Sequence, residues 1–221
     1  MVQKNDSKNT PIDSKLSSYI ENFHKKPLKN LKVLEETFQI DHSHLQIPFS
    51  EGVFLKVFLK SLSAKKVLEI GTFRGFSSVF LAEGLPKEGV LTTIDFDQRN
   101  YSLAESLWKK TKVSKKIRFL KGEGLPLLNS LIKEREIFDV VFIDADKQNM
   151  KEYFLKSLKL LRSGGVVLVD NALWSGKVVE KDQKRESVRC TTEFNEFVFK
   201  TYKENVCLIP AWDGVILVVK K

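Results

Sequence analysis

Two apolar segments of this chain each end in an acidic residue. Residues 138–143 run into Asp144, and residues 166–169 run into Asp170. Continuous apolar runs of this length are typical of parallel strands buried on both faces, and an open parallel sheet binds its ligands beyond the carboxyl ends of its strands. If the two strands are neighbours, about 4.8 Å apart, their carboxylates repel unless a proton or a cation lies between them. The pattern therefore predicts a divalent cation at this edge.

Asn171 follows Asp170 directly and adds a neutral oxygen to the two charged carboxylates. Hard oxygen ligands select Mg²⁺ or Ca²⁺, with Mn²⁺ as a further option, over Zn²⁺, which prefers histidine or cysteine. The net ligand charge balances the ion and leaves coordination positions open. The alternative is structural: Asp170 caps the end of a strand and Asn171 starts a turn.

A second polar constellation surrounds the turn after residues 66–70. Glu69, Gly71 and Gly75 have the spacing Glu-x-Gly-x-x-x-Gly, which differs from the dinucleotide pattern G-x-G-x-x-G. Phe73 and Arg74 fill the turn, which leaves little room for a diphosphate and favours a cationic ligand beside Glu69. Asp95 ends the next strand, where an acidic residue can accept both hydroxyls of a ribose.

These residues require a sheet that brings strand ends together. From residue 66 onward, strands alternate with helices, and this alternation predicts a doubly wound parallel sheet. Its strands are expected at residues 66–70, 90–95, 117–121, 139–143 and 165–170. Two further apolar runs, 206–209 and 215–219, flank a turn that ends in Asp213-Gly214, which is a hairpin signal. The fold class is therefore α/β, with a mixed seven-stranded sheet and an antiparallel C-terminal hairpin.

Helices are predicted before the sheet begins. Apolar residues recur with helical spacing around residues 16–23 and again at 28–38, and Ser50 is expected to be the N-cap of a third helix. We expect a single domain, residues 1–221, with an N-terminal helical segment (1–62) and an α/β core (63–221). The polar first ten residues indicate no signal peptide, no apolar run reaches the ~20 residues of a membrane helix, and a cytoplasmic location is expected.

Taken together, these motifs resemble the S-adenosylmethionine-dependent O-methyltransferases of the catechol and caffeoyl-CoA type. Segments 68–77, 93–97, 138–147 and 164–178 carry the resemblance most strongly. It implies a Rossmann-like methyltransferase fold and a bacterial member of the family. The residues expected to bind S-adenosylmethionine are Ile47, Glu69, Gly71, Thr72, Ser77, Asp95, Gly124, Asp144 and Asp146. The resemblance assigns the metal to Asp144, Asp170 and Asn171.

The same resemblance implies methyl transfer to a hydroxyl of a small catechol-like acceptor with two adjacent hydroxyls. A metal that binds both hydroxyls orients the acceptor and favours its deprotonation. Lys147 is the candidate general base, acting beside Asp144; the alternative is an exposed lysine that opens the next helix. Trp174 and Ser175 are candidates for the substrate wall, as is Trp212 in the closing hairpin; core packing is the alternative for these residues.

Three other hypotheses remain open at this point. The net charge of +9 and a run of basic residues between 109 and 121 suit methylation of a hydroxylated uridine in tRNA, or simply a solvated helix end and a lysine-guarded edge strand. A nicotinamide-dependent oxidoreductase has a similar sheet, but G-x-G-x-x-G is missing. A binding protein that keeps the fold without catalysis is the third. The N-terminal helices resemble those that pack across a homodimer in this family, although their apolar stripes equally suit packing on their own domain.

Overall fold

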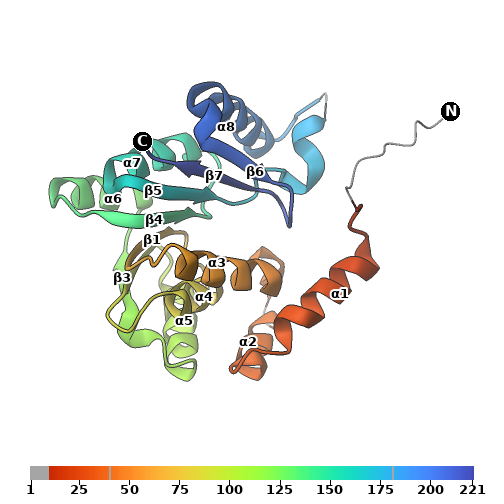
Figure 1. Ribbon diagram of the computed structural model, residues 1–221, viewed down its shortest axis with the longest axis vertical. Coiled ribbons are helices and arrows are strands. Elements are labelled where there is room, and N and C mark those ends of the chain that lie inside the picture. Colours follow the sequence, from red (N-terminus) through yellow and green to blue (C-terminus); the bar gives the residue numbers. More distant parts are fainter. Residues whose placement is uncertain (1–9, 40, 181) are drawn as a thin grey trace.

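The computed structural model describes residues 10–39, 41–180 and 182–221. A seven-stranded sheet in the order β3-β2-β1-β4-β5-β7-β6 forms its centre (Figure 1). The strands are β1 (Lys66–Ile70), β2 (Val90–Asp95), β3 (Ile117–Lys121), β4 (Phe138–Ile143), β5 (Leu161–Val169), β6 (Val206–Ile209) and β7 (Val215–Val219). Only β7 is reversed: it pairs antiparallel with both β5 and β6. The predicted mixed doubly wound sheet is confirmed.

Helices cover both faces of the sheet because the strand side chains are apolar on both sides. One face packs against α3 (Phe49–Ser61), α4 (Phe76–Gly84) and α5 (Gln98–Lys110). The other packs against α6 (Gly124–Lys133), α7 (Met150–Leu160) and α8 (Glu186–Tyr202), as Figure 1 shows. Neighbouring residues of β1 illustrate the division, since Val67 contributes to the first core and Leu68 to the second. None of the helices in the described ranges is long and apolar enough to cross a bilayer.

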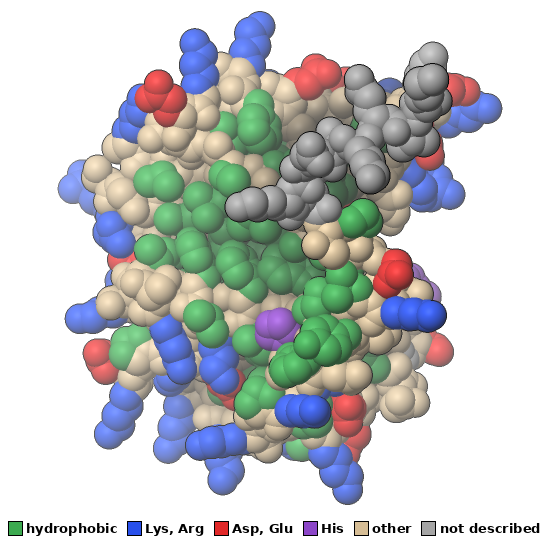
Figure 2. Space-filling model, turned by 45° about the vertical axis from the view of Figure 1, so that its right-hand side comes forward, with side chains coloured by type: hydrophobic (Ala, Val, Ile, Leu, Met, Phe, Trp, Pro, Cys, Tyr) green, Lys and Arg blue, Asp and Glu red, His purple; other side chains and the backbone are tan. Residues whose placement is uncertain are grey.

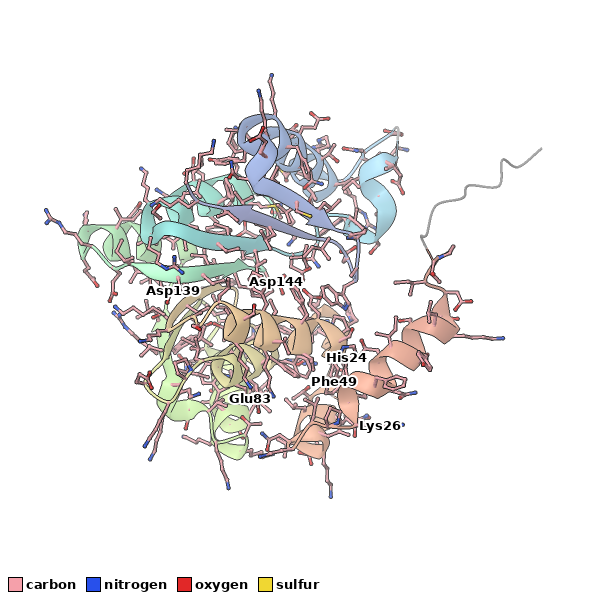
Figure 3. All side chains as sticks on the ribbon, viewed as in Figure 1. His24, Lys26, Phe49, Glu83, Asp139 and Asp144 are labelled. Atoms are coloured by element: carbon pink, nitrogen blue, oxygen red, sulfur yellow. The ribbon has the colours of Figure 1, made fainter. Side chains whose placement is uncertain are left out.

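The connection from β3 to β4 reverses the direction in which strands are added, so that β1 lies between β2 and β4. Such a switch point leaves a crevice beyond the carboxyl ends of the two central strands. Gly71, directly after β1, and Asp144, directly after β4, both lie at this crevice. In Figure 3, Asp144 is labelled at the level between the sheet and α3.

The N-terminal segment differs from the sequence-based expectation in two places. The periodic residues 28–38 form only a short helix, α2 (Leu31–Glu36), because the backbone tightens into a 3₁₀ turn at Thr37–Gln39. Ser50 is not an N-cap: α3 begins at Phe49 after an extended Pro48. The Ser50 hydroxyl instead donates to Glu21 and accepts a hydrogen bond from Trp212, so tertiary contacts override its capping preference. Residues 1–9, on which the absence of a signal peptide was predicted, lie outside the described ranges.

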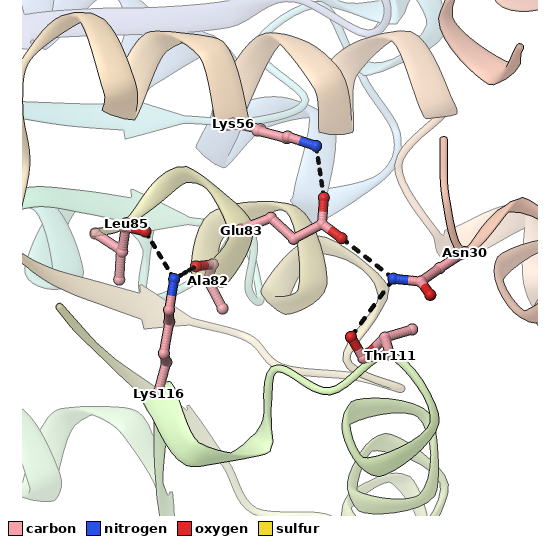
Figure 4. Close-up of polar contacts among 7 residues, drawn as sticks. All are labelled: Asn30, Lys56, Ala82, Glu83, Leu85, Thr111 and Lys116. Carbon is pink, nitrogen blue, oxygen red and sulfur yellow. Dashed lines mark hydrogen bonds and ion pairs between the residues drawn. The ribbon is translucent and has the colours of Figure 1, made fainter. Parts of the chain in front are cut away.

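A half-buried carboxylate ties the N-terminal helices to the core. Glu83, near the end of α4, accepts hydrogen bonds from Lys56 Nζ at 2.6 Å and from Asn30 Nδ2 at 3.3 Å (Figure 4). Lys116 lies nearby and donates to two carbonyls at the end of the same helix, at 3.0 and 2.7 Å. These contacts fix α3, which carries part of the wall of the cavity described next.

Candidate active site

A cavity of about 860 Å³ opens at the carboxyl ends of the strands. It brings together four of the residues predicted to carry the chemistry: Asp144, Lys147, Asp170 and Asn171. Its remaining walls come from the turn before α3, the loop after β5 and the closing hairpin. The other lining residues are His44, Leu45, Gln46, Ile47, Pro48, Glu51, Phe73, Ala145, Trp174, Ser175, Lys177, Arg185, Trp212 and Asp213.

Asp144 and Asp170 are neighbours because β4 and β5 pair in parallel with Ile143 opposite Val169. The side chain of Asp170 is 2% exposed. Burial, followed by the charge of Asp144, raises the pKa of Asp170 to about 8. Burial also raises the pKa of Asp144, against the opposing effect of Lys147. A carboxylate pair held away from water in this way is costly unless a positive charge compensates it.

Lys147 and Asn171 contact each other beside this pair. Lys147 is 5% exposed, and its Nζ donates to Asn171 Oδ1 at 2.8 Å. The same ammonium lies 5.3 Å from the centre of the Trp174 ring, which is a cation–π distance. Asn171 itself has a left-handed backbone with φ of 60° and donates from its backbone N–H to Asp170 Oδ1 at 2.6 Å. The amide oxygen of Asn171 is therefore turned toward the cavity side on which Lys147 lies.

Two acids in this cavity were not predicted from the sequence. Glu51, in the first turn of α3, is 1% exposed, and its Oε1 has no hydrogen-bond partner. Burial, followed by the charges of Asp170 and Asp144, raises the pKa of Glu51 to about 10. Asp213, in the β6–β7 turn, accepts a hydrogen bond from the Ser175 backbone N–H at 2.6 Å. In the sequence, Glu51 is an ordinary residue of a helix start and Asp213 an ordinary turn residue. Only tertiary contacts bring the two acids to the strand ends, so local sequence gives no signal for them.

The residues present fit a hard divalent cation. Two aspartates and an asparagine offer only oxygen donors, and a further buried carboxyl has an unpartnered oxygen beside them. Within the described ranges, no three His, Cys, Asp or Glu side chains are already arranged as a metal cage. The fit therefore rests on the chemistry of the donors and on the burial of their charges.

The turn after β1 carries the second constellation. Gly71 has φ of 98°, and a Cβ there would lie 1.9 Å from the backbone oxygen of Asp144. Only glycine allows this approach. A small adjoining cavity of about 10 Å³ is lined by Ile47, Gly71, Thr72 and Ser77 together with Asp144. Five of the residues expected to bind the cofactor thus surround one narrow space. Asp144 lines both this space and the larger cavity.

Glu69 lies behind this turn and is fully buried. Its Oε1 accepts a hydrogen bond from Ser77 Oγ at 2.5 Å, and its Oε2 accepts from Ser78 Oγ and from Thr93 Oγ1, at 2.6 Å for the latter. Burial raises the pKa of Glu69 to about 7, while the three hydroxyls oppose the shift. In this structure Glu69 orders the turn through Ser77.

The remaining cofactor candidates lie along the ends of β2, β3 and β4. Asp95 accepts backbone hydrogen bonds from Phe73 at 2.7 Å and from Asp97 at 2.9 Å. Asp146 accepts from the Tyr153 hydroxyl at 2.7 Å, and a Cβ on Gly124 would lie 2.7 Å from the same ring. Tyr153 therefore holds Asp146 and Gly124 together. This tyrosine was not predicted, since it lies on the apolar face of α7.

The candidate substrate residues take different positions. Trp174 and Ser175 open the 3₁₀ segment Trp174–Val179, where both have positive φ angles of 47° and 53°. Trp212 lines the cavity from the hairpin, and its Nε1 donates to Ser50 Oγ at 2.7 Å. All three line the cavity, and their role toward an acceptor stays a prediction.

The fold and the paired constellations define a Rossmann-like methyltransferase. A family model described as O-methyltransferase matches residues 12–221. Caffeoyl-CoA O-methyltransferase 1 of Zea mays is 38% identical over 176 residues, which cover 76% of this chain and 68% of the maize protein. The crystal structure of the O-methyltransferase TomG from Streptomyces achromogenes, in complex with SAM, superposes with a TM-score of 0.81 at 29% identity, covering 92% of this chain and 96% of TomG.

An O-methyltransferase from Bacillus cereus in complex with SAH gives the same TM-score of 0.81 at 27% identity, covering 92% of this chain and 97% of the other. The chain therefore belongs to the S-adenosylmethionine-dependent O-methyltransferase family. The family inferred from the motifs is confirmed, the bacterial origin stays a prediction, and an oxidoreductase is not supported.

The Gly71 turn supplies a first test. Gly71→Ala is expected to lower the free energy of unfolding by about 3 kcal/mol or more, because the methyl group meets the Asp144 backbone as well as an unfavourable φ. Gly176→Ala is the matched control: its φ is 77° but nothing lies within 4 Å, so about 1 kcal/mol is expected. Urea unfolding measures both. Equal losses would show that the close approach of Gly71 to Asp144 does not constrain the site.

Glu69 supplies a test with pH. Its pKa rises from 4.5 to about 7 on folding, so the folded state holds the proton more tightly than the unfolded chain. The stabilising contribution is complete below 4.5 and is lost as pH rises through about 7, on the order of 3 kcal/mol. Relative to Glu69→Gln, the wild type should therefore lose stability across this window and stay level above it. Urea unfolding at a series of pH values measures the difference, and a pH-independent difference contradicts the assignment.

Proposed function

We propose that this protein transfers a methyl group from S-adenosylmethionine to one hydroxyl of a small aromatic acceptor with two adjacent hydroxyls, with the help of a divalent cation. The observation that carries the proposal is the convergence of Asp144, Asp170 and Asn171 in a cavity that meets the narrow space at Gly71. The catechol acceptor is supported by the caffeoyl-CoA O-methyltransferase name of the maize relative.

Each residue has a distinct task in this reaction. Asp144, Asp170 and Asn171 would hold the cation, and Mg²⁺ suits their hard oxygens best. A divalent ion bound there supplies a Lewis acid that lowers the pKa of an acceptor hydroxyl. Gly71, Thr72 and Ser77 line the narrow space expected to take the methionine part of the cofactor, while Asp95 would take the ribose.

Lys147 is the proposed general base. Its Nζ is buried at the edge of the cavity, 2.8 Å from Asn171 Oδ1, which places a proton acceptor next to a proposed cation ligand. In the reaction its neutral amine would accept the proton of the acceptor hydroxyl at Nζ while the oxygen attacks the methyl carbon and the bond from that carbon to the sulfonium sulfur breaks, which would leave S-adenosylhomocysteine. The rings of Trp174 and Trp212 offer apolar walls that would hold a flat acceptor and exclude water.

The geometry of the basic cluster between 109 and 121 gives little support to a tRNA acceptor. Lys109, Lys110 and Arg118 pair with glutamates, and Lys116 donates to two carbonyls. The C-terminus of α5 and the start of β3 also lie at the edge opposite the carboxyl ends of the strands. A polyanion bound at most of this cluster would lie away from Asp144.

A homodimer is a further part of the proposal. Tyr19 and Phe23, on the apolar side of α1 (Ser14–Lys25), are 60% and 57% exposed. Val53, Phe54, Val57 and Phe58 of α3 line an open groove of about 480 Å³ together with Trp212 and His24. Figure 2 shows hydrophobic side chains gathered across the middle of the face that brings α1 forward. An apolar surface of this kind suits the same surface of a second copy.

An acceptor screen tests the reaction. With labelled S-adenosylmethionine, we expect methylation of catechol and caffeoyl esters, none of phenols with a single hydroxyl, and loss of turnover when EDTA is added. Restoring Mg²⁺ should restore the rate. Full activity after complete demetallation, or methylation of total tRNA in place of catechols, would show that the acceptor or the cation is wrong.

Asp170→Ala separates the cation site from the cofactor site. Turnover on a catechol should fall by roughly 100-fold or more, while the affinity for S-adenosylmethionine, measured by calorimetry, should stay nearly unchanged. Thr72 lines the cofactor space, and Thr72→Val serves as the opposite control, with weakened cofactor binding expected. An equal loss of cofactor affinity in Asp170→Ala would mean that Asp170 serves the cofactor.

The proposed dimer is tested with Val57→Glu, because Val57 is 57% exposed in the α3 groove. The charge should convert a dimeric wild type into a monomer in sedimentation velocity without loss of circular dichroism. Ile137→Glu is the control, since Ile137 is 46% exposed and does not line the groove. A monomeric wild type at micromolar concentration, or a dimeric Val57→Glu, contradicts the assignment.

A further inference from the structure

Glu51 is the one buried acid of the cavity that the proposed reaction does not use. It is 1% exposed, lines the cavity and lies against Asp170, yet its Oε1 has no partner. A buried carboxyl oxygen without a hydrogen bond is costly, since each such group forfeits its hydration. A proton shared with the adjacent Asp170 carboxyl offsets part of this cost, and a ligand that supplies positive charge or hydrogen-bond donors would offset the rest.

A purely structural role at the start of α3 does not account for this side chain. A glutamate in the first helical turn normally reaches back to the N–H of the N-cap residue. The N-cap of α3 is Pro48, which has no N–H, and Glu51 stands third in the helix after Phe49 and Ser50. The nearby backbone N–H of Ser50 is instead taken by Glu21, at 3.1 Å. The Glu51 carboxyl is therefore left to point at the strand ends.

We propose that Glu51 is a positioning residue of the cation site, whose free oxygen accepts hydrogen bonds from the water shell of the bound ion. This inference rests on the proposed function, because it assumes that Asp144, Asp170 and Asn171 hold a cation. Mg²⁺ and Mn²⁺ keep several waters in protein sites, and such waters need acceptors.

Charge alone is a competing explanation, and Asp213 separates it from a directed contact. Asp213 lines the same cavity, and its field acts on Glu51, Asp144 and Asp170 alike. Unlike Glu51, it already accepts a hydrogen bond, from the Ser175 N–H. Asp213 Oδ1 is already occupied by the Ser175 N–H, whereas the buried Oε1 of Glu51 has no partner.

Mn²⁺ binding to the full-length protein, followed by the electron paramagnetic resonance of the free ion, tests the proposal. Glu51→Gln should weaken Mn²⁺ binding by about 10-fold or more, Glu51→Asp less, and Asp213→Asn by less than about threefold. Asp170→Ala is the positive control and should abolish binding. In EDTA, Glu51→Gln should unfold at the wild-type temperature or above, while the stabilisation gained on adding Mn²⁺ should shrink.

The outcomes are distinct. If Glu51→Gln binds Mn²⁺ with unchanged affinity while Asp170→Ala does not bind it, the role of Glu51 is overturned. The cation site itself is then still supported. Equal weakening in Glu51→Gln and Asp213→Asn reduces the effect to charge and also overturns it. Lower stability in EDTA with unaltered Mn²⁺ affinity assigns Glu51 to the fold. No Mn²⁺ binding by the wild type removes the cation from the proposed function and this inference with it.

Discussion

The site depends on the parallel pairing of β4 with β5, which sets two buried carboxylates side by side. Ile143 lies opposite Val169, so the next residue of each strand is an aspartate at the same sheet edge. Burial raises the pKa values of both carboxyls, and the charge of Asp144 adds to the rise at Asp170. Lys147, in the loop after β4, opposes the rise in the pKa of both carboxyls. A proton or a further positive charge between the two carboxyls relieves this repulsion.

A second constraint joins this acid pair to the cofactor turn. The Asp144 backbone occupies the space that a side chain at position 71 would need, so the ends of β1 and β4 form one rigid unit at the topological switch point. Asp144 consequently belongs to both the narrow space at Gly71 and the wide cavity. A methyl donor at the Gly71 turn and an acceptor in the wide cavity would lie next to each other, because five residues line both spaces.

The strands and their polar ends could be predicted because local sequence specifies them. Buried runs rich in β-branched residues set the strand bounds. An acidic residue directly after such a run must lie at the carboxyl edge of the sheet. Ser50 and Glu51 could not be predicted in the same way. Ser50 bonds to Trp212 across 162 positions of sequence, and Glu51 meets acids from two distant strands. Their sequence looked like an ordinary helix start, and only the packing of α3 over the strand ends gives these residues their contacts.

Helix α3 also links the cavity to the apolar groove on the molecular surface. Its first turn carries Glu51 into the cavity, while Val53, Phe54 and Val57 line the groove outside. Trp212 lines both spaces and is held by its hydrogen bond to Ser50, whose hydroxyl also binds Glu21 of α1. A body that fills the groove therefore presses on the same indole that walls the acceptor cavity. Trp212 is therefore the side chain through which packing on the outside of α3 would reach the cavity wall, and its hydrogen bond to Ser50 fixes the indole between the two spaces.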